Sequence, residues 1–136
     1  MTPVLVDSNV LLDIANSDPA SSEWSHAALA RIGQSSILVI NPLIYAEVSV
    51  GFSRIEELEE VLPRSNFRRD PLPYDAAFLA GKAFLRYRRR GGSRTSPMPD
   101  FSVGAHAAVA GFRLLTRDPQ RYRTYFPTVR LIAPRR

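Results

Sequence analysis

The chain contains no cysteine, only two histidines, and no apolar run that approaches the roughly 20 residues of a membrane-spanning helix. The absence of cysteine excludes disulfides, thiolate metal sites and a cysteine nucleophile, and it fits the cytoplasmic location that we expect. The N-terminus, MTPVLVDSNVLLD, places acidic residues inside its apolar stretch and has no basic leader. We therefore expect neither a signal peptide nor a membrane partner.

Lysine is also scarce, because only Lys82 among the 18 basic residues is a lysine and the others are arginine. Arginine suits bidentate contacts with phosphate, although a codon bias toward GC-rich DNA would explain the same ratio. With 13 acidic residues the formal net charge is +5. This positive charge points to a polyanionic partner, whether the arginine content reflects phosphate contacts or codon bias.

A length of 136 residues and a hydrophobic content of 45% indicate a folded chain with its own core. The sequence shows no internal repeat and no long linker. We therefore predict one domain over residues 1–136.

Short apolar runs alternate with segments of helical spacing along the chain. Strands are predicted at 4–6, 37–40, 114–116 and 129–132, with a further short strand within 65–73. Helices are predicted around 11–15, at 22–32, from Asn41-Pro42 onward, at 55–62, 75–90 and 100–111, with a turn or short helix from Asp118. The strand runs are continuously apolar, as in strands buried on both faces. The predicted fold is α/β, a three-layer sandwich with a central, mostly parallel sheet flanked by helices.

Four acidic residues occupy equivalent places near the carboxyl ends of predicted strands or at the helix starts that follow them: Asp7, Glu47, Asp100 and Asp118. Ligands of open α/β sheets bind at this edge. Carboxylates gathered there repel one another unless a hard divalent cation, Mg²⁺ or Mn²⁺, binds between them. Such an ion can activate water against a phosphodiester. Asp100 could instead be only a helix N-terminal acid, and Asp118 only a turn former.

Two other polar residues are given structural roles at this point. Asp13 is expected to be a solvated helix residue. His106 lies in an apolar helix and is expected to be a core or surface histidine and not a metal ligand.

Three segments resemble known sequences. VLVDSNVLLDIA and INPLIYAEV resemble the segments of PIN domains that carry an aspartate and a glutamate. RRRGGSRTSPMPDFSVGAHAAVAGFRLLTRDPQRYRTYFPTVRLIAP is similar to the C-terminal half of a subgroup of VapC-type toxins. Together the matches cover nearly the whole chain, in the right order and at fitting spacing.

The resemblance implies a PIN-like fold and a metal site of Asp7, Glu47, Asp100 and Asp118. It also implies that Asn9 and Thr116 orient a carboxylate or water by hydrogen bonds. It further implies an endoribonuclease toxin that uses Mg²⁺ or Mn²⁺, forms homodimers, cleaves structured RNA such as transfer RNA, and is neutralised by a cognate antitoxin.

An arginine cluster leads into the loop before Asp100: Arg86, Arg88, Arg89, Arg90 and Arg94. We expect these residues to contact RNA phosphates, although cations at a solvated helix end are also favoured by the helix dipole. Arg117 and Arg121, near Asp118, are weaker candidates for the same role.

Two other phosphotransfer classes fail on the residues available. A haloacid dehalogenase would need a second acid where this chain has Asn9, and a phosphorylated receiver domain would need a lysine after a late strand, whereas Lys82 lies in a predicted helix. Two alternatives stay open on the same fold: a non-catalytic RNA-binding module and a DNA-directed nuclease.

Overall fold

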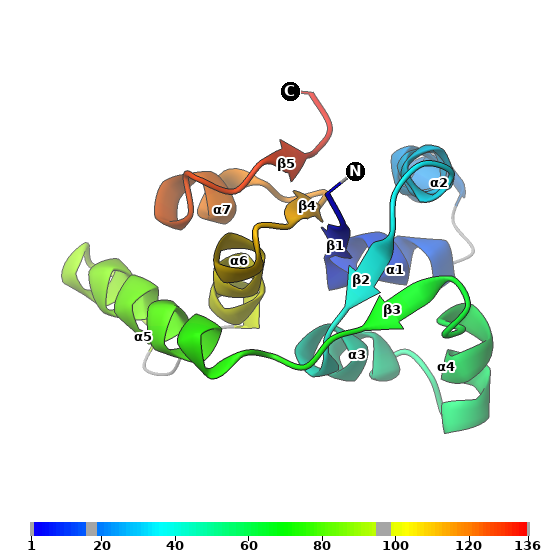
Figure 1. Cartoon of the computed structure of the whole chain (residues 1–136), viewed down its shortest axis with the longest axis horizontal. Helices are drawn as coiled ribbons and strands as arrows, with labels where there is room; N and C mark the ends of the chain where they lie inside the picture. The colour runs from blue at the N-terminus through cyan, green and yellow to red at the C-terminus, as the bar shows by residue number, and fades with distance from the viewer. Residues whose placement is uncertain (1, 16–18, 95–98, 136) are drawn as a thin grey trace.

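The computed structural model describes residues 2–15, 19–94 and 99–135. Its centre is a parallel sheet in the order β3-β2-β1-β4-β5 (Figure 1). The strands are β1 (Val4–Val6), β2 (Leu38–Ile40), β3 (Phe67–Arg69), β4 (Arg113–Leu115) and β5 (Leu131–Ile132). Every pairing is parallel, which confirms the predicted sheet and the short strand expected within 65–73.

Helices connect and enclose the strands, which gives a three-layer α/β sandwich (Figure 1). They are α1 (Ser8–Ala15), α2 (Pro19–Gly33), α3 (Pro42–Ser49), α4 (Ile55–Val61), α5 (Tyr74–Arg89), α6 (Pro99–Ala110) and α7 (Gln120–Tyr125). In Figure 1, α5 and α6 pack together on the side of β4, and α1 packs against α2 on the other side. None of the helices in the described segments is long and apolar enough to span a bilayer.

The predicted elements are confirmed with small shifts of their ends. The second helix begins at Pro19 and not near Ser22, and proline suits the first turn because its missing N–H needs no partner there. Asn41 caps α3 as predicted, since its side chain accepts a hydrogen bond from the Ile44 N–H at 2.9 Å. Of the loop predicted before Asp100, residues 95–98 lie outside the described residues.

The central strand decides where a ligand can bind. All three residues of β1 are fully buried, and the strand lies between β2 and β4. The strands that follow β1 in the chain are placed first on one side of it (β2, β3) and then on the other (β4, β5). In such a sheet, a ligand is expected in the crevice beyond the carboxyl end of β1. Asp7 follows β1 directly, Asn41 follows β2, and Thr116 follows β4.

The expectation that Asp13 is solvated was wrong. Its side chain is buried, and it accepts hydrogen bonds from Ser25 Oγ at 2.6 Å and from an Arg117 terminal nitrogen at 2.8 and 3.0 Å. Asp13 thus joins α1 to α2 and to the segment after β4. His106 is a core histidine, as expected, with Nδ1 3.0 Å from Asn41 Nδ2.

Candidate metal centre

Asp7 is held by hydrogen bonds at the end of β1. Its Oδ1 accepts from the Ser8 N–H at 2.8 Å, and its Oδ2 accepts from the hydroxyls of Tyr122 at 2.8 Å and Thr116 at 2.9 Å. The Asn9 amide donates to the same Oδ2 at 3.3 Å. The carboxylate is almost fully buried, and this burial raises its pKa despite the donors. Its orientation is therefore fixed, while its charge is only partly compensated.

Glu47, on α3, approaches Asp7 from the neighbouring connection. Its Oε1 accepts a hydrogen bond from Ser8 Oγ at 3.0 Å. Partial burial raises the pKa of Glu47, and the negative charges of Asp7 and Asp100 raise it further. The Ser8 hydroxyl and backbone amide thus bind two different carboxylates of one site.

Asp100 is the second residue of α6, and its charge acts on both other carboxyls. Burial raises its pKa, although Arg121 opposes this shift with its Nε 3.0 Å from Asp100 Oδ2. Asp100 in turn raises the pKa values of Asp7 and Glu47. We call Asp7, Glu47 and Asp100 the acidic cluster.

Asp118 lies on the same side of the molecule but is exposed. Its N–H donates to Thr116 Oγ1 at 3.1 Å, and its side chain lines a cavity of about 950 Å³ together with Asp100. Within residues 2–15, 19–94 and 99–135, no three Asp, Glu, His or Cys side chains are close enough to hold one metal ion. The four-ligand metal site therefore stays a prediction.

Thr116 and Asn9 form the hydrogen bonds that a supporting role requires. Thr116 Oγ1 donates to Asp7 and accepts from Asn9 Nδ2 at 3.3 Å. Asn9 Oδ1 accepts from the Arg117 N–H at 3.1 Å. The segment after β4 is thereby tied to the start of α1, and both hold Asp7.

Sequence reasoning missed Tyr122 and the role of Ser8. Tyr122 is buried on α7, and its pKa lies well above its ordinary value because of burial and the nearby charge of Asp7. Its hydroxyl therefore stays protonated and donates to Asp7. The one available signal was its place four residues after Asp118, and Ser8 gave no signal beyond its position next to Asp7.

The predicted arginine cluster lies at the C-terminal end of α5 and beyond it. Arg86 donates to the Tyr125 carbonyl at 3.0 Å, and Arg88 donates to the Arg94 carbonyl. The Arg117 side chain pairs with Asp13 at 2.8 Å. Contact of these arginines with RNA remains a prediction.

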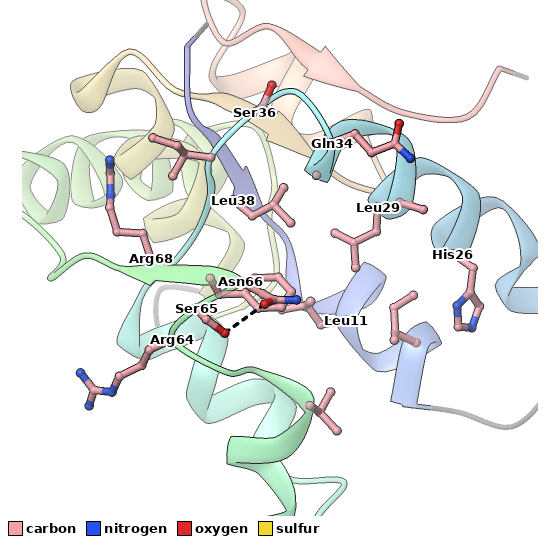
Figure 2. A pocket seen from close by; sticks show the side chains of 16 residues that line it. Leu11, His26, Leu29, Gln34, Ser36, Leu38, Arg64, Ser65, Asn66 and Arg68 are labelled. Carbon is pink, nitrogen blue, oxygen red and sulfur yellow. Dashed lines mark hydrogen bonds between the residues drawn. The ribbon is translucent and has the colours of Figure 1, made fainter.

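A separate cavity of about 810 Å³ lies between α2, β2 and the turn before β3 (Figure 2). Leu11, Leu29 and Leu38 contribute apolar surface to it, and His26 and Arg64 are among its polar residues. Its described lining contains no carboxylate. This cavity therefore offers no carboxylate ligand to a cation.

The donor set of that edge fits a hard divalent cation. Carboxylate and hydroxyl oxygens are the ligands that Mg²⁺ and Mn²⁺ prefer. The pKa values of all three acidic-cluster carboxyls are raised, mainly by burial, so their ionised forms are disfavoured without a cation and a bound cation would stabilise them.

Comparison with known proteins gives the class of this chain. A model of the PIN domain family matches residues 4–127, so the chain belongs to the PIN domain family. A search of curated proteins finds no match.

The fold is similar to those of solved toxin–antitoxin proteins. VapBC2 from Rickettsia felis, bound to a promoter DNA fragment, has a TM-score of 0.71 at 16% identity, covering 96% of this chain and 97% of that chain. A toxin–antitoxin complex from Klebsiella pneumoniae has a TM-score of 0.71 at 20% identity, covering 97% and 98%. Mycobacterium tuberculosis VapC20, a sarcin–ricin loop cleaving toxin, has a TM-score of 0.62 at 15% identity, covering 93% and 98%. These TM-scores show that the fold is shared.

Proposed function

We propose that the chain is a Mg²⁺- or Mn²⁺-dependent endoribonuclease, the toxin of a toxin–antitoxin pair. The observation that carries this proposal is the acidic cluster, in which one buried and two half-buried carboxyls with raised pKa values lie beyond the central strand of a PIN domain. The net charge of +5 supports a polyanionic substrate. The solved structures of similar fold include a sarcin–ricin loop cleaving toxin, which supports RNA as the substrate.

Asp7, Glu47, Asp100 and Asp118 would hold the ion. When bound, a divalent ion supplies charge neutralisation for a phosphodiester and acidifies water. Thr116 and Tyr122 keep the Asp7 carboxylate in one orientation, and Ser8 does the same for Glu47. These side chains thus keep two of the proposed ligands in place before any ion or RNA arrives.

The arginines near the C-terminal end of α5, together with Arg117, would bind phosphates of the RNA backbone. Guanidinium groups can donate two hydrogen bonds to one phosphate. A cognate antitoxin and a homodimer are part of the same proposal, and the solved relatives that contain antitoxins support the first of these.

The test is cleavage by the purified chain, free of any partner. Total cellular RNA is incubated with Mg²⁺ or Mn²⁺, in parallel with a chelator and with the variants Asp7→Asn and Glu47→Gln. Asp75→Asn is the matched control, because Asp75 is an exposed acid on α5, away from the acidic cluster. We expect discrete cuts by the wild type and the control, and none by the two site variants.

Other results would favour the alternatives. RNA that is bound but left intact by the folded, metal-loaded protein would favour a binding module. A preference for flap DNA over structured RNA would favour a DNA-directed nuclease. Size-exclusion chromatography with light scattering tests the homodimer.

A further inference from the structure

Two hollows lie next to each other on the surface, and we call them together the channel. The larger, of about 950 Å³, is lined by Asp100, Asp118 and Arg121, and the smaller, of about 200 Å³, is lined by Arg86, Arg89 and Arg90. Thr124 and Tyr125 line both. Because the two hollows share these residues, a chain-like ligand that lies in both would run from the proposed metal site to the end of α5.

Aromatic rings hold the arginines of this channel. The guanidinium carbons of Arg86, on α5, and of Arg90, which follows its last residue, lie 6.0 and 5.8 Å from the centroid of the Tyr125 ring. Tyr125 is itself anchored, because its ring meets Phe101 edge-on at 5.3 Å. An arginine packed on a fixed ring loses less conformational freedom when it binds an anion.

The same arrangement occurs where the channel meets the acidic cluster. The guanidinium carbon of Arg121 lies 5.2 Å from the Tyr87 ring centroid and 5.4 Å from that of Phe101, while its Nε pairs with Asp100. By contrast, Arg86, Arg89 and Arg90 form no ion pair with any carboxylate in the described segments of the chain. The far end of the channel therefore carries positive charge that no carboxylate of the described residues pairs with.

We propose that this channel binds the backbone phosphates of a single-stranded RNA segment that adjoins the phosphodiester to be cut. The inference rests on the proposed function, because it takes the acidic cluster as the place of cleavage. Fork-shaped guanidinium groups match phosphate oxygens, and guanidinium planes and aromatic rings also suit unstacked bases. Arg89 and Arg90 bind phosphate, and Tyr125 positions Arg86 and Arg90.

The test measures RNA binding without cleavage. A fluorescent single-stranded RNA of mixed sequence is titrated in chelator with wild type and with Arg89→Gln/Arg90→Gln, both exposed side chains. Losing two phosphate contacts should lower the magnitude of the salt slope by about 1.4. The affinity gap between the two proteins should then narrow about sevenfold as salt rises from about 50 to about 200 mM.

The matched control is Arg31→Gln/Arg64→Gln, which removes the same charge from exposed positions outside the channel. It should keep the wild-type slope. Tyr125→Leu should weaken binding with an unchanged slope, because the ring positions arginines and neutralises no charge, whereas Tyr125→Phe should bind like wild type. Thermal melting of each variant establishes that it is folded.

Equal slopes for wild type and Arg89→Gln/Arg90→Gln, or an equal loss in the control, would overturn the proposal. The proposal would also be overturned if Arg89→Gln/Arg90→Gln lost binding to a polyglutamate peptide but kept binding to RNA. The channel would then bind an acidic protein segment. Failure of the proposed function looks different. A wild type that shows the expected slopes but cuts no RNA with metal would refute the activity and leave the channel in place.

Discussion

Replacing Tyr122 with phenylalanine should lower both the stability of the protein and its affinity for a divalent ion. The hydroxyl is buried and donates to Asp7 Oδ2 at 2.8 Å, and the substitution removes only this oxygen. A hydrogen bond to a charged group contributes about 1.5–3 kcal/mol. Thr116 and Asn9 still donate to the same oxygen, so Asp7 keeps two of its three donors there.

The expected shift in melting temperature follows from the size of the chain. At about 2.1 cal/mol/K per residue, unfolding 136 residues corresponds to about 3.5 °C per kcal/mol. Tyr122→Phe should therefore lower Tm by about 5–10 °C where Asp7 is ionised. At acid pH, where Asp7 is protonated, the lost bond is a neutral one, and the decrease should shrink to about half.

Calorimetric titration with Mn²⁺ checks the effect on the metal site. Loss of a group that orients a ligand typically weakens metal binding about 10- to 100-fold. Tyr74→Phe is the control, because Tyr74 is 94% exposed and its hydroxyl forms no hydrogen bond within the described segments. If Tyr122→Phe melts within about 1 °C of this control and binds Mn²⁺ as tightly, the role assigned to Tyr122 is refuted.

The remaining predictions concern pH, Arg121 and Asp13. Because the folded pKa values of the acidic cluster are raised, its contribution to stability is present below the unfolded carboxyl pKa and is lost as pH rises through the folded values. The Tm of the metal-free protein should thus fall as pH rises from the unfolded carboxyl pKa through the folded pKa values. Mn²⁺ should raise Tm, and this increase should grow with pH. Arg121→Gln should tighten Mn²⁺ binding about two- to fivefold by calorimetry, because Asp100 no longer shares its charge with a half-exposed arginine. Asp13→Asn should lower the free energy of unfolding in urea by about 1–3 kcal/mol, because the charge-assisted bonds to Arg117 and Ser25 weaken.

Each of these predictions has a contrary outcome. A Tm increment from Mn²⁺ that is independent of pH would show that the acidic cluster does not bind the ion through its ionised form. Unchanged or weaker Mn²⁺ binding by Arg121→Gln would show that Arg121 does not compete for Asp100. A loss of Mn²⁺ affinity in folded Asp13→Asn would place Asp13 in the metal site, contrary to its contacts.

Much of the fold could be predicted from local patterns. Continuous apolar runs identified β1 and β2, and Asn41-Pro42 identified the start of α3. Since parallel strands end at one edge, the positions of Asp7 and Glu47 also followed from the chain order. The deviations at helix ends are a few residues, where local propensities are weakest.

Contacts between distant segments could not be predicted in the same way. Asp13 has the polar character of a solvated helix residue, and its burial is decided by Arg117, which is 104 positions away. The bond from Tyr122 to Asp7 spans 115 positions. Which arginines line a channel likewise depends on α7 packing near α5, which no local spacing reveals.

The order of the strands has a consequence for biosynthesis. β1 is made first but pairs on one side with β4, and Asp7 receives its Thr116 and Tyr122 hydrogen bonds from near the end of the chain. A nascent chain can pair β1 with β2 early, whereas these donors must first leave the ribosome. As long as the segment with Thr116 and Tyr122 is inside the ribosome, the growing polypeptide therefore cannot hold Asp7 in its final orientation.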